Sequence, residues 1–504
     1  MNTQHEFYNA ARFAKKSWLL NAAIISMAVV LPGCSRHDAL QDAAKQIDAT
    51  GTQSIAFSGT GKWYQFGQAP NPTSAWPQFD VSSYSATINY DTQAARVQIV
   101  RKQTIEAGRE RPAPVEQKPD QYVSKTVAWN LAAPQGAPAD AAPAPQPQPA
   151  AVEERSAEIW STPQGFLRAA ITNNAEQKAN GDKTDVKFSV GNYRYEGVIN
   201  KQNQVESVKT WIDNPVLGDT EFETAYSDYK DFNGVSFPSH IVRTQGGYPV
   251  LDLTIGAVTK NAAAEITVPQ EISSADATKV NVTSEQLAEG VYYLRGGSHH
   301  SVVIEQADHI VIVEAPQHEA RSNAVIAKAK ELIPNKPIAY LVNTHHHFDH
   351  SGGLRTYVDE GATIVTHADN KPYYEKVWSR AHSINPDRLA ASKKAAKFET
   401  FTDSYALYDG KRKIEIHTLA GNGHNDAFAL IYLPAEKILI EADAYTPLAP
   451  NAPRPASVNP YAVNLHENIK KLNLNVDRIA ALHGPGIVKL ADLEDFISAK
   501  TASR

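Results

Sequence analysis

The sequence predicts a chain of two parts, a mostly antiparallel β region at residues 51–280 and a layered α/β domain at residues 281–504. Segments 83–91 (SYSATINYD) and 95–103 (ARVQIVRKQ) alternate apolar and polar residues, as half-buried strands do. From about residue 285, short apolar strands are interleaved with helical patterns. That order predicts a sheet with helices packed outside it.

The composition is that of an ordinary globular protein. The 504 residues carry a net charge of -6, and 42% of them are hydrophobic, which is typical of two to three domains. No basic stripe is present, so a nucleic-acid partner is not expected. The single cysteine, Cys34, excludes an internal disulfide and a cysteine-rich zinc site.

The first residues read as an export signal. Basic residues at 12–16 precede an apolar run at 18–31 and the sequence LPGC, which resembles a bacterial lipobox. We therefore expect a signal peptide at residues 1–33, a lipid on Cys34 and a tether at residues 34–50. Ser35 favours the periplasmic face of the outer membrane. An ordinary cleaved signal, giving a periplasmic protein, or a signal anchor is the alternative.

A Pro/Ala-rich segment interrupts the β region at about residues 131–154. It lacks the periodicity of a packed element and is typical of an extended linker. It is either a domain boundary or a surface insertion in one β domain. The insertion is favoured, because strand patterns resume after it. Residues 40–280 show no constellation of catalytic side chains.

The chemistry is concentrated in NTHHHFDHSGG, residues 343–353, directly after the apolar strand IAYLV. In an extended segment, side chains two residues apart project to the same side. His345 and His347 should therefore converge, and His346 should point away and serve in packing. Asp349 and His350 follow where the chain turns.

Three further residues with metal-binding side chains each follow a predicted strand. Ligand sites in α/β sheets form at such carboxyl ends. These residues are His424, Asp443 and His483.

Together with the HHHFDH motif, this order resembles the metallo-β-lactamase superfamily over about residues 285–490. The resemblance implies an αββα sandwich for the C-terminal domain. It implies two divalent metal ions, with zinc expected and manganese or iron as alternatives. The implied ligands are His345, His347 and His424 for one ion, Asp349, His350 and His483 for the other, and Asp443 as the bridge.

The implied activity is hydrolysis of a small-molecule ester, thioester, lactone or phosphodiester by a hydroxide that bridges the metals. Asp349 would orient this nucleophile. Within the family, a bridging aspartate marks branches other than the true β-lactamases, which carry Cys or Ser at that position. Two alternatives stay open: a periplasmic carrier lipoprotein with a secondary metal domain, and a mononuclear iron redox enzyme of the same fold. No oligomeric state is predicted.

Four more residues are candidate substrate contacts. His299 and His300 lie in a predicted turn near the site, where they either contact substrate or cap the turn. Tyr445 and Tyr461 flank a proline-rich loop that follows Asp443 and would shape the pocket.

Overall fold

The computed structural model describes residues 38–133, 141–275, 280–449, 452, 454–455 and 457–498. The expected signal peptide and Cys34 lie outside these residues. None of the described helices is both long enough and apolar enough to cross a membrane.

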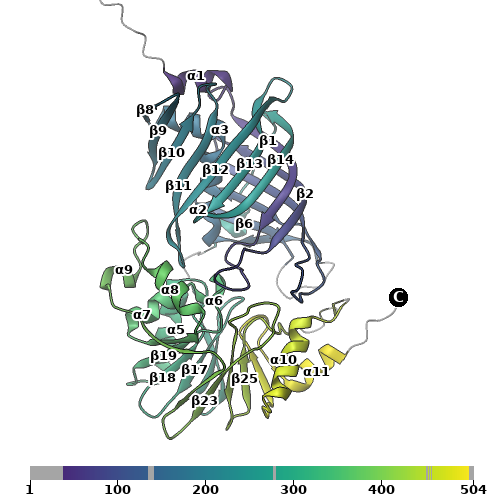
Figure 1. Cartoon of the computed structure of the whole chain (residues 1–504), viewed down its shortest axis with the longest axis vertical. Helices are drawn as coiled ribbons and strands as arrows, with labels where there is room; N and C mark the ends of the chain where they lie inside the picture. The colour runs from purple at the N-terminus through teal and green to yellow at the C-terminus, as the bar shows by residue number, and fades with distance from the viewer. Residues whose placement is uncertain are drawn as a thin grey trace, which may run out of the picture. The chain divides into compact units, whose positions relative to one another are not determined.

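The N-terminal region is built around one large antiparallel sheet, which curves around two helices (Figure 1). Its strand order is β7-β6-β5-β3-β2-β1-β14-β13-β12-β11-β10-β9-β8, with β4 paired to β3. The strands are β1 (Ser54–Tyr64), β2 (Gln78–Asn89), β3 (Ala94–Gln103), β4 (Glu116–Gln117), β5 (Asp120–Ser124), β6 (Val127–Ala132), β7 (Ala144–Pro147), β8 (Glu176–Asn180), β9 (Lys183–Val190), β10 (Tyr193–Ile199), β11 (Val205–Asn214), β12 (Gly218–Asp231), β13 (Ser236–Gln245) and β14 (Tyr248–Lys260).

Helices and a 3-10 turn complete this region. They are α1 (Ala39–Gln46), η1 (Pro149–Ala151), α2 (Val152–Ser161), α3 (Pro163–Thr172) and α4 (Gln270–Ser273). Phe166 and Leu167 of α3 are fully buried in the core with residues from both halves of the sheet. Because β1 pairs with β14, the sheet joins the first and last strands of the region.

Two segments of this region differ from their expected form. The expected tether at 34–50 contains α1, whose Leu40 and Ala43 are buried in the same core as the sheet. The end of the Pro/Ala-rich segment is also structured, since β7 pairs with β6 at the sheet edge and α2 begins at Val152. Prolines are tolerated in β7 because only one side of an edge strand needs hydrogen-bond donors.

The C-terminal region contains two sheets in strand orders β15 to β21 and β22 to β27. The first sheet has β15 (Thr283–Ala288), β16 (Val291–Arg295), β17 (Ser301–Glu305), β18 (Ile310–Val313), β19 (Ile338–Val342), β20 (Thr363–His367) and β21 (Lys397–Phe401). The second has β22 (Ser404–Tyr408), β23 (Lys413–Thr418), β24 (Ala429–Leu433), β25 (Ile438–Glu441), β26 (Arg478–Ala481) and β27 (Ile487–Lys489).

Helices cover the outer faces of the two sheets (Figure 1). They are α5 (Glu319–Leu332), α7 (Leu354–Glu360), α8 (Asn370–Trp378), α9 (Arg388–Ser392), α10 (Pro460–Lys471) and α11 (Leu490–Ser498), while the short helix α6 (Phe348–Ser351) belongs to the HHHFDH motif. One core joins the two sheets and reaches α10 and α11 through Leu465 and Leu493. A second core packs α5, α7 and α8 on the first sheet. The predicted αββα layering is confirmed.

Candidate metal centre

The HHHFDH motif leaves the first sheet where β19 ends at Val342. His347 has an extended backbone and is the N-cap of the short helix α6, which carries Asp349 and His350. The extended segment presents His345 and His347 together, with ring centroids 4.5 Å apart. The helical turn then brings His350 back to 4.4 Å from His345. The motif therefore supplies residues to two adjacent groups of side chains.

The first group consists of His345, His347, His424 and Asp443, whose candidate ligand atoms all lie within 4.8 Å of one another. His424 is 4.5 Å from His347 by ring centroids. Oδ2 of Asp443 lies 3.0 Å from Nε2 of His424 and 3.5 Å from Nε2 of His345. Three imidazoles and a carboxylate are a ligand set suited to zinc and similar ions.

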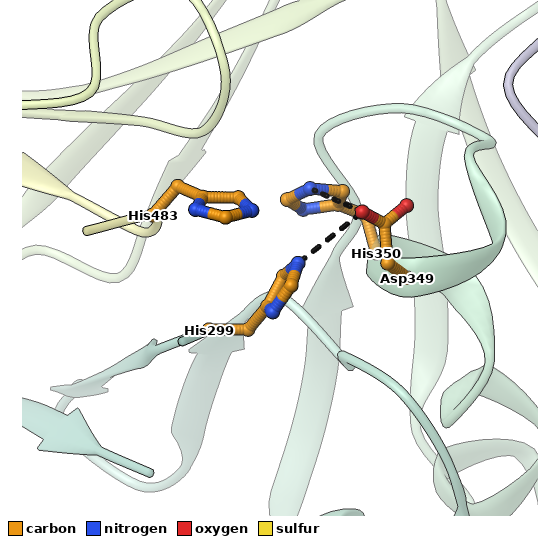
Figure 2. Close-up of side chains that lie close together, drawn as sticks. All are labelled: His299, Asp349, His350 and His483. Carbon is orange, nitrogen blue, oxygen red and sulfur yellow. Dashed lines mark hydrogen bonds and ion pairs between the residues drawn. The ribbon is translucent and has the colours of Figure 1, made fainter. Parts of the chain in front are cut away.

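The second group consists of His299, Asp349, His350 and His483, again with ligand atoms within 4.8 Å. Figure 2 shows the three rings and the carboxylate pointing toward a common centre. Oδ2 of Asp349 lies 3.3 Å from Nε2 of His299 and 3.8 Å from Nε2 of His350. A backbone bridge between His299 and His483 holds the strand-end segments of the two sheets together. His299 thus lies among the predicted ligands rather than in a separate substrate pocket.

Asp443 lies between the two groups. Its Oδ2 is also 3.0 Å from Nε2 of His350, so one oxygen faces imidazoles of both groups. This is the position that a carboxylate bridging two ions requires.

Among the described residues, five orphaned polar atoms at this centre belong to predicted ligands, and Nε2 of His346, a predicted non-ligand, is orphaned as well. In the described part of the chain, several buried polar atoms here have no hydrogen-bond partner. They are Nε2 of His345, Nδ1 of His347, Nε2 of His350, Nε2 of His424 and Oδ1 of Asp443. Buried polar atoms are rarely left unsatisfied, and metal ligation is one accepted reason. The residues therefore fit a pair of divalent ions.

The protonation states of His345, His347 and Asp443 suit metal ligation. Burial lowers the pKa of His345 to about 3 and holds that of His347 well below its usual value, so both rings are neutral near pH 7. Burial raises the pKa of Asp443, but the charge of His350 and the close imidazoles of His345, His350 and His424 outweigh it. The pKa of Asp443 is therefore well below its usual value, and its carboxylate is ionised.

Glu314 orients two of these histidines, and sequence reasoning missed it. It is fully buried directly after β18, and Oε2 accepts a hydrogen bond from Nδ1 of His350 at 3.2 Å. The same oxygen accepts from the hydroxyl of Thr344, whose Oγ1 lies 3.0 Å from Nδ1 of His345. Nε2 of each ring is thereby directed at Asp443, the outer-shell arrangement common around protein metals. In the sequence, the available signal for this residue was an acid directly after the apolar strand IVIV.

Glu314 also has a φ of 76°, a left-handed conformation that non-glycine residues rarely adopt. Such strain costs on the order of 1–3 kcal/mol and is concentrated at functional sites. The strained backbone therefore supports a functional position for this carboxylate.

A loop of the N-terminal region, residues 65–71, completes the surroundings of the motif. Nε2 of His347 donates to the carbonyl oxygen of Ala69 at 2.8 Å, which leaves Nδ1 as the free ring nitrogen. Nε2 of Gln68 donates to Oδ1 of Asp349 at 2.8 Å. Gly67 has a φ of +75°, and a Cβ there would lie 2.5 Å from Cγ of Phe348. No local pattern predicted these contacts, which join residues about 280 positions apart.

A second N-terminal loop approaches His424 from the other side. Arg109 donates to both carboxylate oxygens of Asp426, at 2.8 and 3.0 Å. A Cβ at Gly423 would overlap the carbonyl oxygen of Glu110, so the two backbones pass in direct contact. The loop that carries His424 is therefore fixed by the N-terminal region.

His346 points away from both groups, as the strand alternation predicts. It is buried, and its Nδ1 lies 3.1 Å from the side-chain nitrogen of Asn425. Its ring packs 5.6 Å from that of Tyr373.

The remaining candidate substrate contacts differ in whether they face the site. Both ring nitrogens of His300 are engaged with backbone, the nitrogen of Gly296 and the carbonyl of Gly484, which fits the turn-capping alternative. Tyr445 is buried in the inter-sheet core against Phe496. Tyr461 does face the site, since its ring lies 5.5 Å from His424.

The family comparison matches the C-terminal region of the chain. Residues 294–444 match the family model described as the metallo-beta-lactamase superfamily. No match is found among curated proteins.

Solved structures match less than half of the chain. A metallo-beta-lactamase from Pontibacter korlensis is 15% identical, with a TM-score of 0.32, and the match covers 43% of this chain and 98% of that one. The FIM-1 metallo-beta-lactamase from Pseudomonas aeruginosa is 18% identical, with a TM-score of 0.32, covering 44% and 95%. A rubredoxin oxygen:oxidoreductase from Desulfovibrio gigas is 15% identical, with a TM-score of 0.35, covering 43% and 61%.

The layering of the two sheets, the convergent histidines and the family match agree on one assignment. In the C-terminal part of this chain, residues 294–444 match the metallo-β-lactamase superfamily.

Proposed function

We propose that the protein is a dinuclear metal-dependent hydrolase that acts on an ester, thioester, lactone or phosphodiester. The observation that carries this proposal is the position of Asp443, whose single oxygen faces both His424 and His350. Two ligand groups sharing one carboxylate suit a pair of ions that act on one substrate. When bound, such ions supply Lewis acidity and lower the pKa of water.

The protein residues have separable tasks in this proposal. His345, His347 and His424 would hold one ion, and Asp349, His350 and His483 the other, with His299 beside them. Glu314 keeps the rings in the ligating tautomer.

Asp349 is the most exposed acid of the centre, with a third of its side chain accessible. Burial raises its pKa, but the charge of His350 and the hydrogen bond from His299 lower it below its usual value. It therefore stays ionised and can hold the nucleophile by a hydrogen bond. This role needs contact with the reacting water, which the partial exposure of the side chain permits.

A substrate would enter beside His483. A cleft of about 910 Å³ lies there, with Gly484, Thr446 and Pro447 on one wall and Pro112 and Val115 on another. That volume is within the range of small-molecule sites. Tyr445 is not part of this lining, in keeping with its burial.

Metal analysis and a substrate panel test the proposal. The purified protein should hold close to two equivalents of zinc, manganese or iron and should cleave at least one generic ester, lactone or phosphodiester. Loss of activity on chelation and its return with added metal are expected. One iron per chain with oxygen consumption would instead support the redox alternative and overturn hydrolysis.

We also propose that the chain is exported and anchored by a lipid on Cys34. The motif LPGC after a basic and apolar segment supports this. Mass spectrometry of the mature N-terminus should find a diacylated or triacylated cysteine, and Cys34→Ala should release the protein from membranes. A mature chain that begins at another residue would contradict the proposal.

A further inference from the structure

A cavity of about 430 Å³ lies inside the N-terminal sheet and reaches the metal centre. One wall is apolar and includes Tyr84, Ile99, Val123 and Leu251 from four strands. At one end the cavity is bordered by Gln68, Phe348 and Asp349. At another part of its wall lie the charged side chains of Glu154, Arg155, Glu158 and Arg243. The proposed function does not use this space.

Three of the four charged groups already have close partners. Arg243 donates to Glu158 in an ion pair. Arg155 donates at 2.9 Å to the carbonyls of Tyr122 and Trp129, and at 2.7 Å to Oδ1 of Asn130. Nη1 of Arg243 and both Nη atoms of Arg155 therefore already donate to protein acceptors.

Glu154 is the exception. No side-chain hydrogen bond or ion pair within 4 Å engages its carboxylate among the described residues, although it lines the cavity from α2. Burial, together with the charge of Glu158, raises its pKa. Its side chain is half-buried, so a ligand in the cavity can satisfy a carboxyl that lacks a protein partner. When ionised, this group is a hydrogen-bond acceptor.

The residues that line the cavity determine which kind of ligand it would bind. Apolar strands around the space favour a chain or ring of hydrocarbon. An anionic end would face the carboxylate of Glu154, whereas an amine or hydroxyl would donate to it. The contact with Asp349 at the other end places such an occupant next to the metal ligands.

We propose that this cavity binds the part of the substrate that does not react, an apolar chain whose far end carries a hydrogen-bond donor for Glu154. This proposal rests on the proposed hydrolase function, because it makes the cavity an extension of the same site. Each added methylene that enters the cavity should tighten binding about fourfold.

Binding to metal-free protein tests the cavity without any catalysis. Calorimetric titration of the chelated full chain with 1-decylamine and 1-decanol should show saturable binding, at least tenfold tighter than with decanoate. Glu154→Leu should reduce decylamine affinity at least tenfold. Glu176→Leu, on the exposed strand β8, is the matched control and should change nothing.

Filling the cavity is the second test. Ala95→Phe and the milder Val97→Phe both place a ring in the space and should abolish binding of all three probes. Ala179→Phe on the exposed strand β8 is their control. Decanoate binding as tightly as decylamine, no binding of any probe, or full binding by both filled variants would overturn the proposal.

A kinetic readout links the cavity to the metal centre. With esters of increasing acyl length, kcat/KM should rise in the parent protein, and Val97→Phe should remove this rise while leaving the metal content unchanged. A rise that persists in Val97→Phe would overturn the proposal. Failure of metal uptake would instead overturn the hydrolase function and leave the binding result standing.

Discussion

Replacing Gln68 by methionine isolates the contribution of the N-terminal region to one metal position. The substitution keeps the length and shape of the side chain but removes the donor 2.8 Å from Oδ1 of Asp349. Hydrogen bonds to charged groups contribute about 1.5–3 kcal/mol. Loss of outer-shell partners typically weakens metal binding by about 10- to 100-fold, which is the same range. We therefore expect the second group to lose about 10- to 100-fold in affinity.

The assay is stepwise metal titration against a chelator of known affinity. Gln68→Met should weaken only the ion held by Asp349 and leave the ion at His424 within about twofold. Gln98→Met, exposed on β3 of the N-terminal sheet, is the control and should match the parent. Equal weakening of both ions, or of neither, would refute the assignment of Gln68 to the second group. Gln68→Glu should weaken it further, because two carboxylates would then face each other.

Five other substitutions test the metal centre, the loop that contacts it and one half-buried carboxyl of the N-terminal sheet. His346→Asn should retain both ions, whereas His345→Asn should empty one site, as measured by metal content; equal loss in both variants would contradict the strand geometry. Glu314→Gln should weaken both ions about 10- to 100-fold, because one carboxylate orients a histidine of each group, and loss confined to one ion would argue against this. Gly67→Ala should lower the unfolding free energy by at least about 1 kcal/mol, since it adds a Cβ at positive φ against an aromatic ring; an unchanged melting temperature would oppose it. Burial raises the pKa of Asp213 to about 6. Between about pH 4 and 6 this carboxyl therefore binds more protons in the folded state than in the unfolded state, so stability should fall as pH rises through that window. Asp213→Asn should flatten the profile of melting temperature against pH.

The sequence was most informative where chemistry follows local periodicity. The split of the HHHFDH motif came from the alternation of an extended chain, and His346 indeed turns toward Asn425. Helical patterns were expected between the strands after residue 285, and α5, Glu319–Leu332, is one of these helices. The distant candidates were each expected at the end of a predicted strand. They lie near the motif, because the strand ends meet at one edge of the sandwich.

Non-local contacts were beyond such reasoning. Gln68 and Ala69 lie in a loop with no motif of its own, and their partners lie almost 280 residues away. His299 was expected near substrate, but pairing with His483 carries it into the second group. Likewise α1 has polar composition, and only its apolar stripe of Leu40 and Ala43 reveals that it packs.

The pairing of β1 with β14 sets an order of assembly. The N-terminal sheet is complete once Lys260 is in place, whereas the first histidine of the metal centre is His299. Domains generally fold as units from the N-terminus during synthesis. The loop at residues 65–71 can therefore fold before the HHHFDH motif that it contacts has folded. Metal uptake would then mark the last step of maturation.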